Sequence, residues 1–135
     1  MNTRTFALIF GIVFIAAGVA GFVPQLLQPA EGGEIASGPH HLLLLGIFPV
    51  NPLHNVVHLL FGLWGLAASR SATGAVTYAR GVAIIYAVLA VCGWIPSLDD
   101  LFGYVPLYGN DVWLHLGLAV VAAYFGWVNR SPAGA

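Results

Sequence analysis

The sequence predicts an all-α integral membrane protein, built as a bundle of four transmembrane helices. Two observations carry this prediction: the composition is apolar, and the apolar residues fall into four stretches of membrane-spanning length. Of 135 residues, 59% are hydrophobic and 7% are charged, whereas soluble domains carry about 25% charged residues. Such a chain cannot cover a water-facing surface with polar side chains, so we expect a lipid bilayer around it.

The expected spans follow from the thickness of the membrane, whose hydrocarbon core of about 30 Å takes about 20 helical residues. They are residues 5–23, 52–69, 75–95 and 111–129, with long outer loops at 24–51 and 96–110. We expect residues 1–135 to form one domain. The apolar segment 42–50 is too short to span, and we predict that it lies at the interface or against the bundle.

The charged residues separate along the chain as the positive-inside rule describes. Arginine occurs before the first span, around the turn between the second and third spans, and after the fourth: Arg4, Arg70, Arg80 and Arg130. Acidic residues occur in or beside the two long loops: Glu31, Glu34, Asp99, Asp100 and Asp111. Both termini are therefore expected in the cytoplasm, with the protein in a cell membrane, most simply a bacterial inner membrane. A net charge of −1 offers no surface for nucleic acid.

The sequence also predicts an internal repeat. The segment GFVP at 21–24 matches GWIP at 93–96, an offset of 72. At this offset Gly11, Phe14 and Gly18 align with Ala83, Tyr86 and Ala90. Spans two and four match at an offset of 57, which aligns His54 with Asp111 and His58 with His115, although the match fades at Arg70 and Trp127. We predict two parallel-repeat helical hairpins related by an axis along the membrane normal; chance similarity between two apolar hairpins is the alternative.

Two stripes of polar and small residues follow helical spacing on spans two and four. The first consists of His54, His58, Gly62, Gly65 and Ser69, and the second of Asp111, His115, Ala119, Ala122 and Gly126. Residues three and four apart share one helix face. Small residues let helices approach closely in lipid, so both stripes are expected to face the interior of the bundle.

The polar outer ends of these stripes are expected to bring His54, His58, Asp111 and His115 together, with a structural polar cluster of Asn51, Asn55 and Asn110 nearby. Helix capping explains some of these residues. Asn51 before Pro52 is typical of an N-cap followed by proline at the first helical position, and Asn110 or Asp111 can cap the fourth span. Capping does not explain His58, about 10 Å into its helix, or His115.

Three interpretations stay open for these histidines. They could hydrogen-bond across the bundle, to each other, to Asn55, to Tyr86 or to backbone. They could bind zinc or iron, with His54, His58, Asp111 and His115 as metal ligands; ring nitrogens of His58 and His115 more than about 8 Å apart would exclude a shared ion. Lastly, His58 or His115 could be the axial ligand of a haem or chlorin, a tetrapyrrole for which the glycines make room. His40 and His41 are expected in solvent or at the interface.

The segments GIFPVNPLHNVVHLLFGLWGL at 46–66 and DVWLHLGL at 111–118 resemble a bacterial family of four-span membrane proteins classed only as a domain of unknown function, with an NPLHNxxH signature. The resemblance covers most of the chain. It implies the four-helix architecture and singles out recurring polar or small positions: Asn51, His54, Asn55, His58, Gly62, Asp111 and His115. It implies no mechanism.

The leading functional hypothesis is a non-enzymatic accessory or scaffold subunit whose polar cluster orders the bundle. Such a subunit works as a homo-oligomer or within a larger membrane complex. The rival hypothesis is a metal- or tetrapyrrole-binding protein that uses His58 and His115. An enzyme with a metal-activated water is the third. The sequence has no Gly-rich phosphate loop and no nucleophile elbow, so it predicts no catalytic residues.

Overall fold

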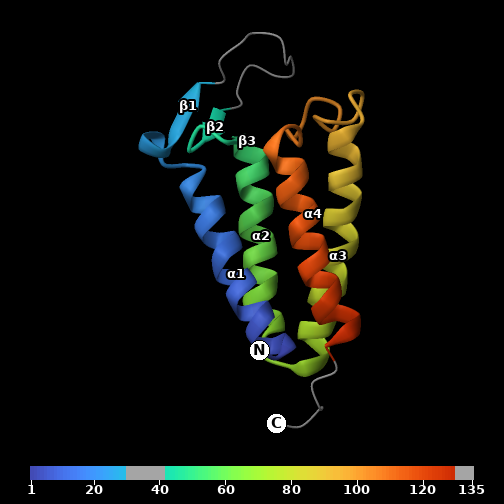
Figure 1. Ribbon diagram of the computed structural model, residues 1–135. Helices are drawn as coiled ribbons and strands as arrows, with labels where there is room; N and C mark the ends of the chain where they lie inside the picture. The colour runs from blue at the N-terminus through green and yellow to red at the C-terminus, as the bar shows by residue number, and fades with distance from the viewer. Residues whose placement is uncertain (30–41, 130–135) are drawn as a thin grey trace.

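The structure, a computed structural model, describes residues 1–29 and 42–129 of the chain. Over these residues, four α-helices run side by side, with a small sheet and the loop between α3 and α4 at one end and the turn between α2 and α3 at the other (Figure 1). The helices are α1 (Thr3–Ala20), α2 (Pro52–Ala68), α3 (Ala72–Trp94) and α4 (Asn110–Ala123), the last continued by a π-helical segment, η2 (Tyr124–Val128). Part of the first long loop, with Glu31, Glu34, His40 and His41, lies outside the described residues, as does Arg130.

Three of the helices are long and apolar enough to cross a membrane: α1, α3, and α4 taken together with η2. Helix α2 is also apolar but shorter, with 17 residues. Large apolar side chains point outward on every helix, and Ile12, Leu60, Val88 and Val120 are each more than half exposed. An apolar surface of this extent is compatible with a helical protein surrounded by lipid.

The helices pack as two pairs, α1 with α2 and α3 with α4. Within each pair the chain runs up one helix and down the other, and a short turn joins α2 to α3 (Figure 1). Aromatic rings fill the centre between the pairs: Phe6 stacks on Phe125, and Phe14 packs against Tyr86 with their ring centroids 5.4 Å apart. The core therefore joins the first pair to the second.

Helices α1 and α2 approach each other closely at two glycines of the predicted stripe. A Cβ atom placed on Gly65 would lie 2.8 Å from the Cα of Gly11 and 2.9 Å from the carbonyl oxygen of Ala7. A Cβ atom on Gly62 would lie 2.8 Å from the Gly11 carbonyl oxygen. Backbone therefore meets backbone along this seam, which only a residue without a side chain permits.

Both predicted stripes are largely buried, as expected. The buried members are His54, Gly62, Gly65, Asp111, His115, Ala119, Ala122 and Gly126. His58 and Ser69 are half-buried. The helical spacing in the sequence therefore identified which faces of α2 and α4 turn inward.

The first outer loop departs from the all-α expectation. Its described part contains a 3₁₀ turn, η1 (Pro24–Leu26), and three short strands, β1 (Leu27–Pro29), β2 (Leu42–Leu44) and β3 (Phe48–Val50). They form an antiparallel sheet in the order β1-β2-β3, with Leu44 opposite both Leu27 and Phe48. Segment 42–50 is thus a hairpin. It reverses at Leu45 and Gly46, whose φ angles of 54° and 70° favour glycine and turn the chain.

The far end of α4 widens into η2. Here the Gly126 carbonyl accepts a hydrogen bond of 2.8 Å from Nε of Arg80, and the Arg80 guanidinium lies 5.5 Å from the ring centroid of Trp127. A π-helical turn holds an extra residue and rotates the side chains that follow it. The repeat match fades at this point, at Trp127, which agrees with the change of helix geometry.

The close contact at the glycines of α1 and α2 predicts that adding one methyl group destabilises the protein at Gly65 but not at Gly117. Gly65→Ala should lower the free energy of unfolding by about 1–3 kcal/mol, because its Cβ would press on backbone atoms of α1. Gly117→Ala on α4 is the matched control, because a Cβ there meets nothing within 4 Å and alanine favours a helix by up to about 1 kcal/mol. The measurement is unfolding of the purified protein in mixed micelles by added SDS. Equal losses in the two variants would contradict the close approach.

Candidate functional site

Helix α2 begins in the way that the sequence predicts, and this start places two histidines. The side chain of Asn51 accepts a 2.8 Å hydrogen bond from the backbone N–H of His54, and Pro52 occupies the first helical position. Asn51 is therefore the N-cap, as expected. His54 falls in the first turn and His58 one turn further along, on the same face of the helix.

Helix α4 begins differently from the prediction. Its N-cap is Gly109, with a φ angle of 66° and no side-chain cap bond, so the expectation that Asn110 or Asp111 caps this helix is wrong. Glycine adopts this positive φ angle readily, and because it has no side chain, the first turn of α4 has no side-chain cap. Asn110 instead donates a hydrogen bond of 3.3 Å to the carbonyl of Ile47. Asp111 is buried in the first turn.

Three histidines from these two helices meet inside the protein. His54, His58 and His115 each offer one ring nitrogen, and these three atoms lie within 4.8 Å of one another. The rings of His54 and His58 are 4.5 Å apart between centroids, and those of His54 and His115 are 6.3 Å apart. The distance that would exclude an ion shared by His58 and His115 is therefore not reached.

Buried polar atoms without hydrogen-bond partners are concentrated at this cluster. Among the described residues they include Nδ1 of His54, Nδ1 of His115 and Oδ2 of Asp111. The side chains are buried, with exposed fractions of 3% for His54, 1% for His115 and 2% for Asp111. Nε2 of His54 lies 3.8 Å from Oδ2 of Asp111, too far for a hydrogen bond. A buried polar atom without a partner costs about 1–3 kcal/mol, so a partner that satisfies several of these atoms together would stabilise the arrangement.

Aromatic and backbone groups wall the cluster. The Phe14 ring lies 5.7 Å from the His58 ring, and the Tyr86 ring meets the His115 ring edge-on at 5.0 Å. The backbone of Pro49, at the end of the outer sheet, faces His54. These neighbours pack against the histidine rings and restrict their movement.

Each of the three asparagines of the expected polar cluster donates a hydrogen bond to a carbonyl of another segment. Asn55 donates a 2.7 Å hydrogen bond to the carbonyl of Gly21, at the end of α1. Asn51 donates one of 2.8 Å to the carbonyl of Tyr104, in the second outer loop. Asn110 reaches Ile47 in the first outer loop, as described above. Each asparagine therefore fastens a helix start to another part of the chain.

The second outer loop, which spans residues 95–109 in the structure instead of the predicted 96–110, carries two acidic residues, Asp99 and Asp100. Partial burial raises the pKa of Asp99, and the adjacent carboxylate of Asp100 raises it further. Burial also raises the pKa of the Tyr108 hydroxyl, with smaller contributions from Asp99 and Asp111. Both shifts favour the protonated, neutral forms of these groups.

Comparison with known proteins places the chain in a family. The family described as "Domain of unknown function (DUF4383)" matches residues 4–128, a range that contains α2, α3, α4, all of α1 except its first residue, and the whole histidine cluster. The chain belongs to the DUF4383 family. This confirms the resemblance to a domain of unknown function, and the family description assigns no activity. Searches of curated proteins and of solved structures find no match.

The sequence identified the histidines and Asp111 of this DUF4383 chain but missed the residues around them. Phe14 and Gly21 were noted only as positions of the predicted repeat, although the alignment of that repeat could have linked Phe14 to the histidines. Phe14 aligns with Tyr86, and the two rings contact the two aligned histidines, His58 and His115. Nothing in the sequence indicated that Pro49 lies beside His54, because its position depends on the sheet in the first loop.

The bond between Asn55 and Gly21 can be tested by a double-mutant cycle. Asn55→Ala should lower the free energy of unfolding by about 1–3 kcal/mol, because the buried Gly21 carbonyl loses its donor. Gly21→Ala should also destabilise the protein, since its Cβ would overlap the Asn55 side chain. In the Asn55→Ala background the overlap is gone, so Gly21→Ala should cost less, by about 0.5–3 kcal/mol. Strictly additive losses in SDS unfolding would argue against this contact.

Proposed function

We propose that this DUF4383 chain is a four-span integral membrane protein that binds one transition-metal ion, zinc in the first instance, inside its outer end. His54, His58 and His115 supply three ligand nitrogens, and Asp111 supplies the fourth ligand atom. The observation that carries the proposal is the convergence of three ring nitrogens within 4.8 Å. No reaction is assigned to the ion.

The donor set and its spacing support an ion. Imidazole nitrogen with carboxylate oxygen suits zinc or iron, and zinc takes four such ligands in a tetrahedron. With bonds near 2.1 Å, ligand atoms around zinc lie about 3.4 Å apart. The present separations of up to 4.8 Å between histidines, and 3.8 Å between His54 and Asp111, are slightly longer. Small side-chain rotations would close them, and binding would satisfy Nδ1 of His115 or Oδ2 of Asp111 where these atoms are the ligands.

The packing favours an ion over a tetrapyrrole or a purely structural cluster. A macrocycle needs open space beside the histidines, but the space beside Gly62 and Gly65 is occupied by the backbone of α1. A structural hydrogen-bond cluster needs partners, but Nδ1 of His115 has none among the described residues, and Asn55 is engaged with Gly21. The scaffold hypothesis is therefore the second candidate. In it, water molecules in place of an ion would hydrogen-bond to the unpaired histidine and aspartate atoms.

Four spans are supported by the length and placement of α2. Its 17 residues reach about 26 Å at 1.5 Å per residue, within the shorter end of the range for a transmembrane helix. It also packs beside α1 over much of its length. Arg4 and Arg70 lie at one end of the helices and Asp99, Asp100 and Asp111 at the other, which favours a cytoplasmic N-terminus by the positive-inside rule.

The internal repeat gains support from matched burial and matched contacts. Phe14 and Tyr86 are both buried and touch, and each packs on the histidine of its own hairpin, His58 or His115. His54 and Asp111, the next aligned pair, also face each other. This arrangement is what a pseudo-two-fold axis through the cluster predicts. A bacterial inner membrane, a single domain and assembly into a homo-oligomer or larger complex stay predictions.

The metal proposal predicts about one zinc or iron per chain by elemental analysis of protein purified from its native membrane. His54→Asn, His58→Asn and His115→Asn should each lower the metal affinity by more than about tenfold, because even residues that only support a ligand contribute 10–100-fold. His41→Asn is the control, since the sequence predicts this histidine outside the cluster.

An absorption spectrum of the same sample separates the alternatives. We expect no Soret band. Purified protein that contains no metal would overturn the proposal in favour of a structural cluster. So would a metal content that none of the three histidine variants lowers. A Soret band lost in His58→Asn or His115→Asn would overturn it in favour of a tetrapyrrole.

The topology predicts that both termini lie in the cytoplasm, so green fluorescent protein fused to either end should fluoresce and alkaline phosphatase fused to either end should be inactive. Four spans bring both ends to one face, and the arginine placement selects the cytoplasm. Fusions of alkaline phosphatase and of green fluorescent protein at each end provide the measurement. A C-terminal fusion with high phosphatase activity beside a fluorescent N-terminal fusion would show an odd number of spans, with α2 not crossing the bilayer.

A further inference from the structure

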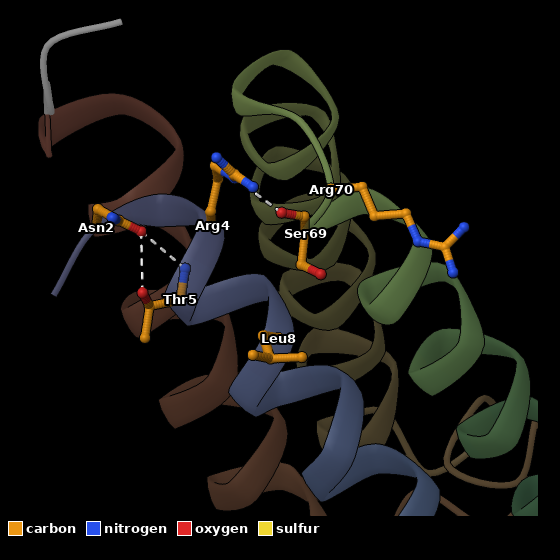
Figure 2. A pocket seen from close by; sticks show the side chains of 6 residues that line it. All are labelled: Asn2, Arg4, Thr5, Leu8, Ser69 and Arg70. Carbon is orange, nitrogen blue, oxygen red and sulfur yellow. Dashed lines mark hydrogen bonds between the residues drawn. The ribbon is translucent and has the colours of Figure 1, made fainter. Parts of the chain in front are cut away.

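A shallow pocket lies at the opposite end of the helices from the histidines, where α1 begins and α2 ends. It is lined by Asn2, Arg4, Thr5, Leu8, Ser69 and Arg70 (Figure 2). Its volume is about 330 Å³, so it can hold a group larger than a few water molecules. The lining combines two arginines and three small polar side chains with one leucine.

One arginine is held at this pocket by the backbone of α2. Nε of Arg4 donates a hydrogen bond of 2.9 Å to the carbonyl oxygen of Ser69, which fixes its guanidinium beside the end of α2 (Figure 2). A guanidinium carries five N–H donors, so the donors on its two terminal nitrogens stay available. Arg70 follows Ser69 in the chain, and its exposed side chain extends away from Arg4 in this view, so it can swing toward a ligand.

The positive charge of these arginines is not neutralised by neighbouring acids. Within residues 1–29 and 42–129, neither Arg4 nor Arg70 forms a salt bridge. The described acidic residues, Asp99, Asp100 and Asp111, belong to the outer loop and the start of α4, at the far end of the helices. Unpaired arginines beside an opening in the surface are suited to an anion, and a guanidinium fork matches the oxygens of a phosphate.

An apolar track continues from the pocket along the surface of α1. Leu8 lines the pocket and is 43% exposed, and Ile12 lies one turn further along and is 55% exposed. Residues four apart share one face of a helix. A molecule whose phosphate sits between the arginines could therefore lay a hydrocarbon chain over Leu8 and Ile12.

We propose that this pocket binds the phosphate of an anionic phospholipid headgroup, with the lipid's acyl chain against Leu8 and Ile12. Basic pockets at the cytoplasmic ends of transmembrane helices have the charge that such headgroups require. Free inorganic phosphate offers the same oxygens but has no part that uses the apolar track. The proposal requires the membrane placement of the helices and does not depend on metal binding at the histidines.

The test measures lipid retention by native mass spectrometry of the full chain in micelles that contain phosphatidylglycerol and phosphatidylcholine. We expect one phosphatidylglycerol to be retained in preference to phosphatidylcholine. Arg4→Gln and Arg70→Gln should each weaken this binding about fivefold, the effect of about 1 kcal/mol per arginine at a membrane surface. Arg80→Gln is the charge-matched control, because Arg80 contacts Gly126 and Trp127 instead of the pocket.

Three results would overturn the proposal: equal retention of both lipids, equal weakening in Arg80→Gln, or displacement of the lipid by millimolar inorganic phosphate alone, which would identify a soluble-phosphate site. Helical circular dichroism checks that each variant folds. Arg70→Gln leaves the Arg4–Ser69 bond intact, so its result decides the question even if Arg4→Gln proves unstable.

Discussion

The contact between the backbones of α1 and α2 is the constraint on which the rest of the structure depends. In lipid, apolar side chains gain nothing by leaving their surroundings for one another, so helices need close van der Waals contact or polar bonds to stay together. Gly11, Gly62 and Gly65 supply that contact. With α1 and α2 fixed in this way, the Asn55 side chain reaches the Gly21 carbonyl, and Phe14 reaches the ring of His58. The polar outer end is thus positioned by an apolar seam some turns away from it.

The same packing explains how polar side chains can be concentrated in an otherwise apolar interior. His54 and His58 project from one helix, and His115 and Asp111 from a helix of the other pair. The aromatic rings of Phe14 and Tyr86 occupy the space beneath them, which keeps the histidines near the outer end. Polar groups there are expensive to bury without partners. A bound cation would offset that cost.

Periodicity in the sequence was enough to locate the four helices and the inward faces of α2 and α4, because residues three and four apart must share a side of a helix. It also located His54, His58, Asp111 and His115, because polar residues are rare enough in this chain to be noticed. It could not foresee the strands of the first loop, since the short apolar run at 42–50 has no helical or alternating pattern and turns at Leu45 and Gly46. Nor could it foresee that Gly109 begins α4, because Asn110 and Asp111 both have side chains suited to capping. Long-range bonds such as that of Asn51 to Tyr104 leave no trace in local spacing.

Two of these long-range bonds run in opposite directions between the halves of the molecule. Asn51, at the start of α2, holds the second outer loop through Tyr104, and Asn110, at the start of α4, holds the first outer loop through Ile47. Each hairpin therefore fastens the loop of the other. Displacing Tyr104 therefore pulls on the start of α2, where His54 lies, and displacing Ile47 pulls on the start of α4, where Asp111 lies. A force on either loop therefore acts on a helix turn that carries part of the histidine cluster.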